Sequence, residues 1–274
     1  MRRILDDCQP RWPVPRLVAM VLSRKLCQEI SVTDCGFADH APMSEDLHDG
    51  LHCSGTLRTI VELSGQDMHR RKFLLGSAFN AAAYSEPALF ALTVPPAEST
   101  AQAGGRRVGL TEVEILTEQV TQLRQLDYRY GSARLREQVV SLLHREANQL
   151  LHGTYSEKIG TALLTAVAQA TRLAGFTAAD MGRPVLAQRY FIQGLDLAMA
   201  AGDRLYAAYV LSDMSRMTVQ IGQNALTEDD RLRNGRQAVA LARAGLAVAQ
   251  GAATPAQAAE LHALEARGRS LGCR

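Results

Sequence analysis

The sequence predicts an all-α protein, and three observations support this fold class. Aromatic residues make up only 5% of the 274 residues, alanine is abundant, and the second half of the chain places apolar residues at helical spacing. Strands favour β-branched and aromatic side chains, whereas alanine and leucine favour helices. Hydrophobic residues at 47% and charged residues at 21% are ordinary for a globular chain.

Length, charge and cysteine content limit the functions that the chain can have. A chain of 274 residues is expected to form one large or two small domains. The net charge of +2 gives no support for an extensive nucleic-acid surface. No stretch has the roughly 18–20 consecutive apolar residues that a membrane span needs, so we expect no membrane partner. The five cysteines are odd in number and lack CxxC spacing, which argues against a disulfide framework.

Residues 1–37 are expected to form a small helical segment at the N-terminus. The stretch VPRLVAMVLSRKL places Leu17, Val21 and Leu22 at helical spacing. Pro13 and Pro15 precede these residues, which suits the start of a helix.

Residues 38–109 are expected to form a linker with short helices. Pro95-Pro96 and Gly104-Gly105 interrupt the segment, and TLRTIVEL at 56–63 predicts a short helix. The same segment contains MHRRKFLLGSAFNAAA at 68–83, in which an arginine pair precedes a small apolar run. That order is typical of a twin-arginine export signal.

Possible metal ligands gather around the start of this linker, but their spacing fits no standard zinc motif. We interpret them as a polar loop and predict neither a metal nor another cofactor. The residues are Cys35, His40, His48, His52 and Cys53.

Residues 110–274 are expected to contain about seven helices of roughly 15–20 residues joined by short connections. The first has a capping box, with Thr111 as cap and Glu114 three residues later. Gly131 and Gly153 mark the ends of the first two helices. The predicted helical stretches are 110–131, 132–153, 154–175, 182–203, 204–222, 231–251 and 254–272.

This array also contains a degenerate internal repeat. Gly175, Ala187, Phe191 and Gly194 have the offsets at which a tetratricopeptide repeat places small, small, aromatic and small residues. The sequence therefore predicts a tetratricopeptide-like right-handed superhelix of antiparallel helix pairs. A plain helical bundle with alanine-rich seams shares the first-order pattern and is the alternative. Small residues repeat the second-helix spacing, without the aromatic, at Ala238, Ala242 and Gly245.

Several strings within residues 108–250 resemble a family of actinomycete, Streptomyces-type, transcriptional regulators. They are LRQLDYRYG, GTYSE, AQRYFIQGLDLAMAAGDR and VLSDMSR, in this order. The family joins an N-terminal helix-turn-helix of the XRE type to tetratricopeptide-like repeats. Residues 1–37 resemble the last helices of its DNA-binding domain, and an arginine pair followed by Phe-Leu is common between its two halves. The resemblance implies transcription regulation in the cytoplasm.

The DNA-binding domain departs from the family, because its recognition helix would lie upstream of Met1. We therefore expect DNA binding only from an extended N-terminus or through an intact paralogue. The candidates for DNA-backbone contacts are arginines, whose guanidinium groups bind phosphates, and the alternative is four solvated side chains near a terminus. They are Arg2, Arg3, Arg11 and Arg16.

The chain is expected to bind a ligand and not to be an enzyme. It contains no GxSxG, GxxxxGK[ST], HExxH or GxGxxG motif. Stacked helix pairs form a concave surface lined by the first helix of each pair, here 156–175 and 203–222. Polar residues on those helices are the ligand-groove candidates, with ordinary solvent-facing side chains as the alternative. They are Gln169, Arg172, Ser212, Arg216 and Gln220.

The predicted function is therefore that of a transcriptional-regulator-like protein. Its repeat domain binds a peptide, small molecule or protein partner and mediates homodimerisation. The alternative is an exported helical-repeat scaffold that starts at Met68, with a cleavage site at Ala81-Ala82-Ala83.

Overall fold

Helices form almost all of the described structure, which confirms the predicted all-α class. The computed structural model describes residues 53–68, 79–93, 100–103 and 105–272, which all lie in one unit, Asp49–Arg274. Within these ranges, extended backbone pairs only as isolated bridges, between Gln102 and Tyr155 and between Arg107 and Thr154.

The helices of the C-terminal region follow the predicted stretches closely. The predicted helix at 132–153 is α5, α6 and a π-helical turn (η5) between them. The predicted helix at 154–175 continues to Asp180. The bounds are α4 Leu110–Tyr130, α5 Ser132–Ser141, η5 Leu142–Ala147, α6 Asn148–Leu151, α7 Glu157–Asp180, α8 Pro184–Ala200, α9 Arg204–Gln223, α10 Glu228–Val248 and α11 Pro255–Ser270.

Side chains cap the starts of several helices. Asp203 accepts a hydrogen bond from the Tyr206 N–H at the start of α9. The start of α4 differs from the prediction, because the cap is Gly109 and not Thr111. The Glu112 carboxylate accepts a hydrogen bond from the Gly109 N–H at 3.0 Å, so the first turn is closed two residues earlier than predicted.

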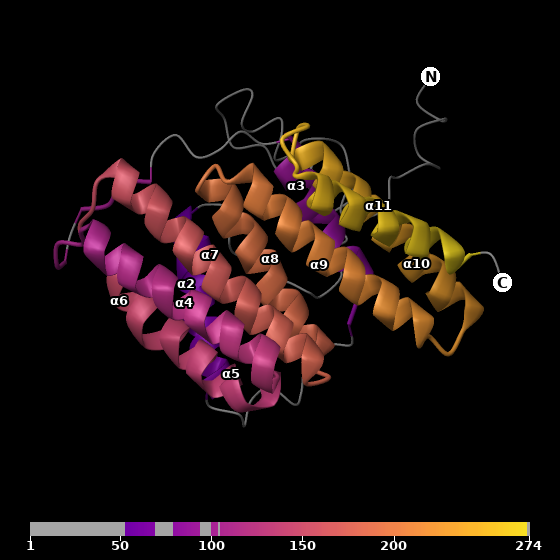
Figure 1. Cartoon of the computed structure of the whole chain (residues 1–274), viewed down its shortest axis with the longest axis horizontal. Coiled ribbons are helices and arrows are strands. Elements are labelled where there is room, and N and C mark those ends of the chain that lie inside the picture. Colours follow the sequence, from indigo (N-terminus) through magenta and orange to yellow (C-terminus); the bar gives the residue numbers. More distant parts are fainter. Residues whose placement is uncertain (1–52, 69–78, 94–99, 104, 273–274) are drawn as a thin grey trace, which may run out of the picture. The chain divides into compact units, whose positions relative to one another are not determined.

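The helices pack in two series. The first helices α4, α7, α9 and α11 contact one another in that order, and each of α7 and α9 also packs along the helix that follows it (Figure 1). We call the surface formed by α4, α7, α9 and α11 the first-helix face. We call α5, α8 and α10 the second series. Two helices from the predicted linker, α2 (Cys53–Met68) and α3 (Ser85–Thr93), pack against it. Helix α2 contacts α5 and α8, and α3 contacts α8 and α10.

The seam between α7 and α8 depends on small residues. Gly175 is buried, and a Cβ atom placed there would lie 2.8 Å from the ring of Phe191. Ala187 and Phe191 are also buried. The Phe191 ring of α8 therefore packs directly against the α7 backbone at Gly175, where a larger residue would need the ring to move. A Cβ atom placed at Gly194 would lie 3.7 Å from its nearest neighbour, which is an ordinary van der Waals contact.

A buried ion pair fastens α2 to this core. The Arg136 and Asp67 side chains are only 7% and 5% exposed, and the guanidinium donates to the carboxylate. Arg136 also donates to the Ala174 carbonyl at 2.9 Å and the Thr177 hydroxyl at 3.0 Å. The Tyr190 hydroxyl donates to Asp67 at 3.0 Å. Burial lowers the pKa of Arg136, although Asp67 opposes that shift.

Candidate functional site

A row of charged side chains crosses the first-helix face. Arg172 of α7 donates through Nε to Asp213 of α9 at 2.5 Å. Arg216 of α9 donates to the other oxygen of Asp213 at 2.9 Å and to Glu260 of α11. We call these four residues the charged row. The Asp213 side chain is 1% exposed, whereas that of Arg216 is 40% exposed. A buried carboxylate needs such partners, so Asp213 holds two cations at the surface.

Aromatic rings hold the first cation of the row. The Arg172 guanidinium lies 5.9 Å from the ring centre of Tyr206 and 5.8 Å from that of Tyr209. Both distances suit cation–π contacts. Burial alone would lower the pKa of Arg172, but the charge of Asp213 raises it above its ordinary value. Burial also raises the pKa of Tyr206 to about 12. At neutral pH this cluster therefore combines a permanent cation with a neutral phenol.

A pocket of about 370 Å³ lies beside this cluster, between α4, α7 and the start of α9. We call it the α4–α7 pocket. Its volume is at the lower end of the roughly 300–1,000 Å³ that ligand pockets have. Arginines, aspartates and aromatic rings all contribute to its walls. The lining residues are Val120, Arg124, Asp127, Tyr128, Gln169, Arg172, Leu173, Phe176, Asp180 and Tyr206.

One corner of the α4–α7 pocket is anionic. The Ser132 hydroxyl lies 2.8 Å from an Asp127 oxygen and 2.9 Å from an Asp180 oxygen. Burial and, more weakly, Asp180 raise the pKa of Asp127, while the Ser132 hydrogen bond opposes that shift. Asp127 lies in the last turn of α4 and Asp180 ends α7. Negative charge is unfavourable at helix C-termini, so a cation would stabilise this corner.

Three of the five predicted groove residues lie in these features. Gln169 and Arg172 line the α4–α7 pocket, and Arg216 belongs to the charged row. Ser212 is fully buried and donates to the Tyr209 carbonyl at 2.8 Å, so the prediction that it faces a groove is corrected. Gln220 is exposed but lines a different pocket of about 470 Å³, together with residues of α7 and α10.

Several residues of the site were not among the candidates predicted from the sequence. Asp213 and Arg216 are three residues apart on α9, and so are Arg124 and Asp127 on α4. That spacing places side chains on one helix face and was a usable signal. No comparable local signal identifies Glu260, because its partner Arg216 is 44 residues away.

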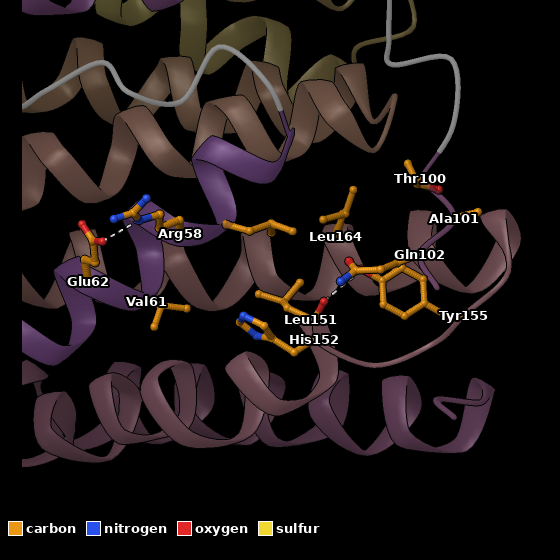
Figure 2. A pocket seen from close by; sticks show the side chains of 11 residues that line it. Arg58, Val61, Glu62, Thr100, Ala101, Gln102, Leu151, His152, Tyr155 and Leu164 are labelled. Atoms are coloured by element: carbon orange, nitrogen blue, oxygen red, sulfur yellow. Dashed lines mark hydrogen bonds and ion pairs between the residues drawn. The ribbon is translucent and has the colours of Figure 1, made fainter. Parts of the chain in front are cut away.

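A second pocket of about 600 Å³ lies beside α2 (Figure 2). Its charged pair is already formed, with Arg58 and Glu62 joined at 2.9 Å. The Tyr155 hydroxyl donates to Gln102 at 2.9 Å. Aliphatic side chains make up much of the remaining wall, so this pocket selects a ligand chemistry less sharply than the α4–α7 pocket. The lining residues are Leu57, Arg58, Val61, Glu62, Thr100, Ala101, Gln102, Leu151, His152, Tyr155 and Leu164.

The other predicted features fall largely outside the described residues. This applies to the DNA-backbone candidates Arg2, Arg3, Arg11 and Arg16, and to the side chains of the cysteine–histidine cluster. Among the residues that the structure describes, no group of three or more His, Cys, Asp or Glu side chains could hold a metal ion. No described helix is both long and apolar enough to span a membrane.

Comparison with known proteins gives one local similarity. A family model described as the SP15 N-terminal domain matches residues 1–38. No curated protein matches the chain, and no solved structure does. The matched segment precedes all of the described helices in the sequence and nearly coincides with residues 1–37, the predicted N-terminal helical segment.

Proposed function

We propose that the chain is a regulatory protein whose first-helix face binds a peptide segment of a partner. The charged row is the observation that supports this proposal best. It joins three helices through the buried Asp213 and leaves two guanidinium groups partly exposed. Arginines held in this way are preorganised, so a ligand does not have to order them on binding.

We further propose that the helices from residue 110 onward form a tetratricopeptide-like repeat. Two series of helices, with α4, α7, α9 and α11 in one and α5, α8 and α10 in the other, suit a stack of antiparallel pairs. The close approach of α7 and α8 at Gly175 and Phe191 also suits such a repeat. The first helices would then line the concave side, where repeat proteins bind peptides.

The proposed regulatory role follows from the position of α2. This helix follows residues 1–52 in the sequence, packs against the second series and is fastened there by Asp67 and Arg136. Peptide binding would shift the population between two curvatures of the repeat and so change how α2 is held. As a homodimer in the cytoplasm, the protein would act through protein contacts. We propose no enzymatic activity.

Peptide selection with the full chain tests this function. Peptides from a random display library would be selected against the wild type, and their affinities would be measured for two tryptophan variants. Gln169→Trp places a bulky ring in the α4–α7 pocket. Gln138→Trp is the matched control, because Gln138 is exposed on α5, in the second series.

We expect the selected peptides to bind the wild type and Gln138→Trp equally. Gln169→Trp should weaken them about tenfold or more, the scale of a change of about 1.4 kcal/mol. Far-UV circular dichroism checks that both variants fold. Failure to select any peptide, or peptides that bind Gln169→Trp as well as the wild type, would overturn the proposal.

A further inference from the structure

We propose that the α4–α7 pocket binds a small zwitterion, a free amino acid or a dipeptide with an apolar side chain. Its ammonium group would lie between Asp127 and Asp180, and its carboxylate against Arg124. This inference rests on the proposed function in one respect only, because it assigns a ligand chemistry to the same first-helix face.

The anionic corner has one hydroxyl proton for two carboxylates. Ser132 has one hydroxyl proton, yet its oxygen lies within hydrogen-bond distance of both Asp127 and Asp180. The hydroxyl donates to one carboxylate and leaves the other contact without a proton. An ammonium group brings three donors and a positive charge, and it satisfies both carboxylates. The C-terminal ends of α4 and α7 add their negative partial charges at the same place.

One turn before Asp127, helix α4 also contributes a cation that is not paired within the described residues. Arg124 makes no ion pair or hydrogen bond within the described part of the chain, although it lines the pocket. The other cation of the pocket, Arg172, is already bound to Asp213. A guanidinium group binds a carboxylate through two parallel hydrogen bonds, which favours a carboxylate ligand at Arg124.

The spacing of the two ends suits a small molecule. Arg124 and Asp127 are three residues apart on α4, a separation that places their Cβ atoms about 5–6 Å apart. The two groups do not pair with each other, because Asp127 is turned to Ser132. An ammonium and a carboxylate of one amino acid or dipeptide can therefore bind the two side chains together.

The remaining walls favour an apolar side chain on that ligand. Leu173, Phe176 and Tyr206 line the pocket from α7 and α9. Tyr128 lies at its edge and is 93% exposed, so its ring is available to cover a bound side chain. Aromatic rings bury a large apolar area at contact, which adds affinity without a further charge.

Calorimetric titration of the full chain tests the inference. The probes are L-phenylalanine and the dipeptide L-leucyl-L-phenylalanine, each with its N-acetylated and its C-amidated derivative. We expect at least one zwitterion to bind, with either modification weakening it about tenfold or more, because each removes a charge-assisted contact. Whichever of the two zwitterions binds more tightly identifies the source of the ligand.

Variants assign each charge to its residue. Asp127→Asn and Asp180→Asn should reduce the preference for the free ammonium, and Arg124→Gln should remove the preference for the free carboxylate. Arg129→Gln, an exposed arginine of α4, is the matched control and should leave both preferences unchanged. Failure of both zwitterions to bind, or equal affinity for the N-acetylated forms, would overturn the inference. Selected peptides that are sensitive to Gln169→Trp would leave the proposed function standing in that event.

Discussion

Replacing Asp127 with asparagine should stabilise the unliganded protein at neutral pH. In the wild type, the Ser132 hydroxyl lies between two carboxylates but donates to only one at a time. The asparagine amide has two N–H donors and nearly the same shape as the carboxylate. It can donate to the Ser132 oxygen while the Ser132 hydroxyl donates to Asp180.

Two contributions set the size of the gain. A hydrogen bond that replaces an unsatisfied contact contributes about 1 kcal/mol to the free energy of unfolding. Removing a negative charge from the last turn of a helix contributes about 0.3–1 kcal/mol more. We therefore expect a gain of about 1–2 kcal/mol, which raises the melting temperature of a unit of this size by roughly 2–8 °C.

The gain should also depend on pH. Burial raises the pKa of Asp127 in the folded protein above its ordinary value of 3.8. The folded state therefore holds this proton more tightly than the unfolded state, and the wild type loses stability as the pH rises through the folded-state pKa. Asparagine does not titrate, so the advantage of the variant should be small near pH 4 and complete at neutral pH.

Urea and thermal denaturation followed by circular dichroism, at about pH 4 and about pH 7, measure both effects. Glu114→Gln is the control, because Glu114 is an exposed carboxylate of α4 whose loss should change stability by less than about 0.5 kcal/mol. If Asp127→Asn destabilises the protein at neutral pH, or raises the free energy of unfolding equally at both pH values, the interpretation that one Ser132 proton serves two carboxylates is wrong.

Two further stability predictions follow from the packing. Asp67→Ala should cost about 3–5 kcal/mol, because it leaves Arg136 buried without its carboxylate, and adding Arg136→Met should recover part of that loss. Additive costs in urea denaturation would contradict this coupling. Gly175→Ala should destabilise by about 1–3 kcal/mol through overlap with Phe191, whereas Gly194→Ala should gain up to about 1 kcal/mol in helix propensity. Equal melting temperatures for the two glycine variants would refute the close approach at Gly175.

The helices were predictable because their signals are local. Apolar spacing and capping residues lie within a few positions of the turns that they stabilise, so α4 to α11 appear close to where the sequence places them. Gly175 shows where this reasoning fails. It was interpreted as the end of a helix, but α7 continues to Asp180. The glycine is needed for a contact with Phe191 of α8, which the spacing of the repeat indicated although the helix end was placed too early.

The candidate site was predictable only in part. The register of α7 and α9 indicated Gln169, Arg172 and Arg216, because residues of one helix face recur every three or four positions. Ser212 was assigned to the wrong environment, since α9 packs against α8, α10 and α11 and buries more than one of its faces. The contact of Glu260, by contrast, depends on the packing of α11 against α9, which brings this carboxylate to Arg216.

The sequence by itself therefore determined the all-α class, the approximate helix bounds and the residues that share a helix face. Each of these depends on interactions between residues close in the chain. Only the tertiary structure decided that Asp213 carries two arginines, that Asp127 and Asp180 meet at Ser132, and that α2 is fastened through a buried ion pair. Arg172 and Asp213 are 41 residues apart, Ser132 and Asp180 are 48 apart, and Asp67 and Arg136 are 69 apart. Contacts over such separations depend on how the helix faces pack and on how strongly burial removes these charges from water.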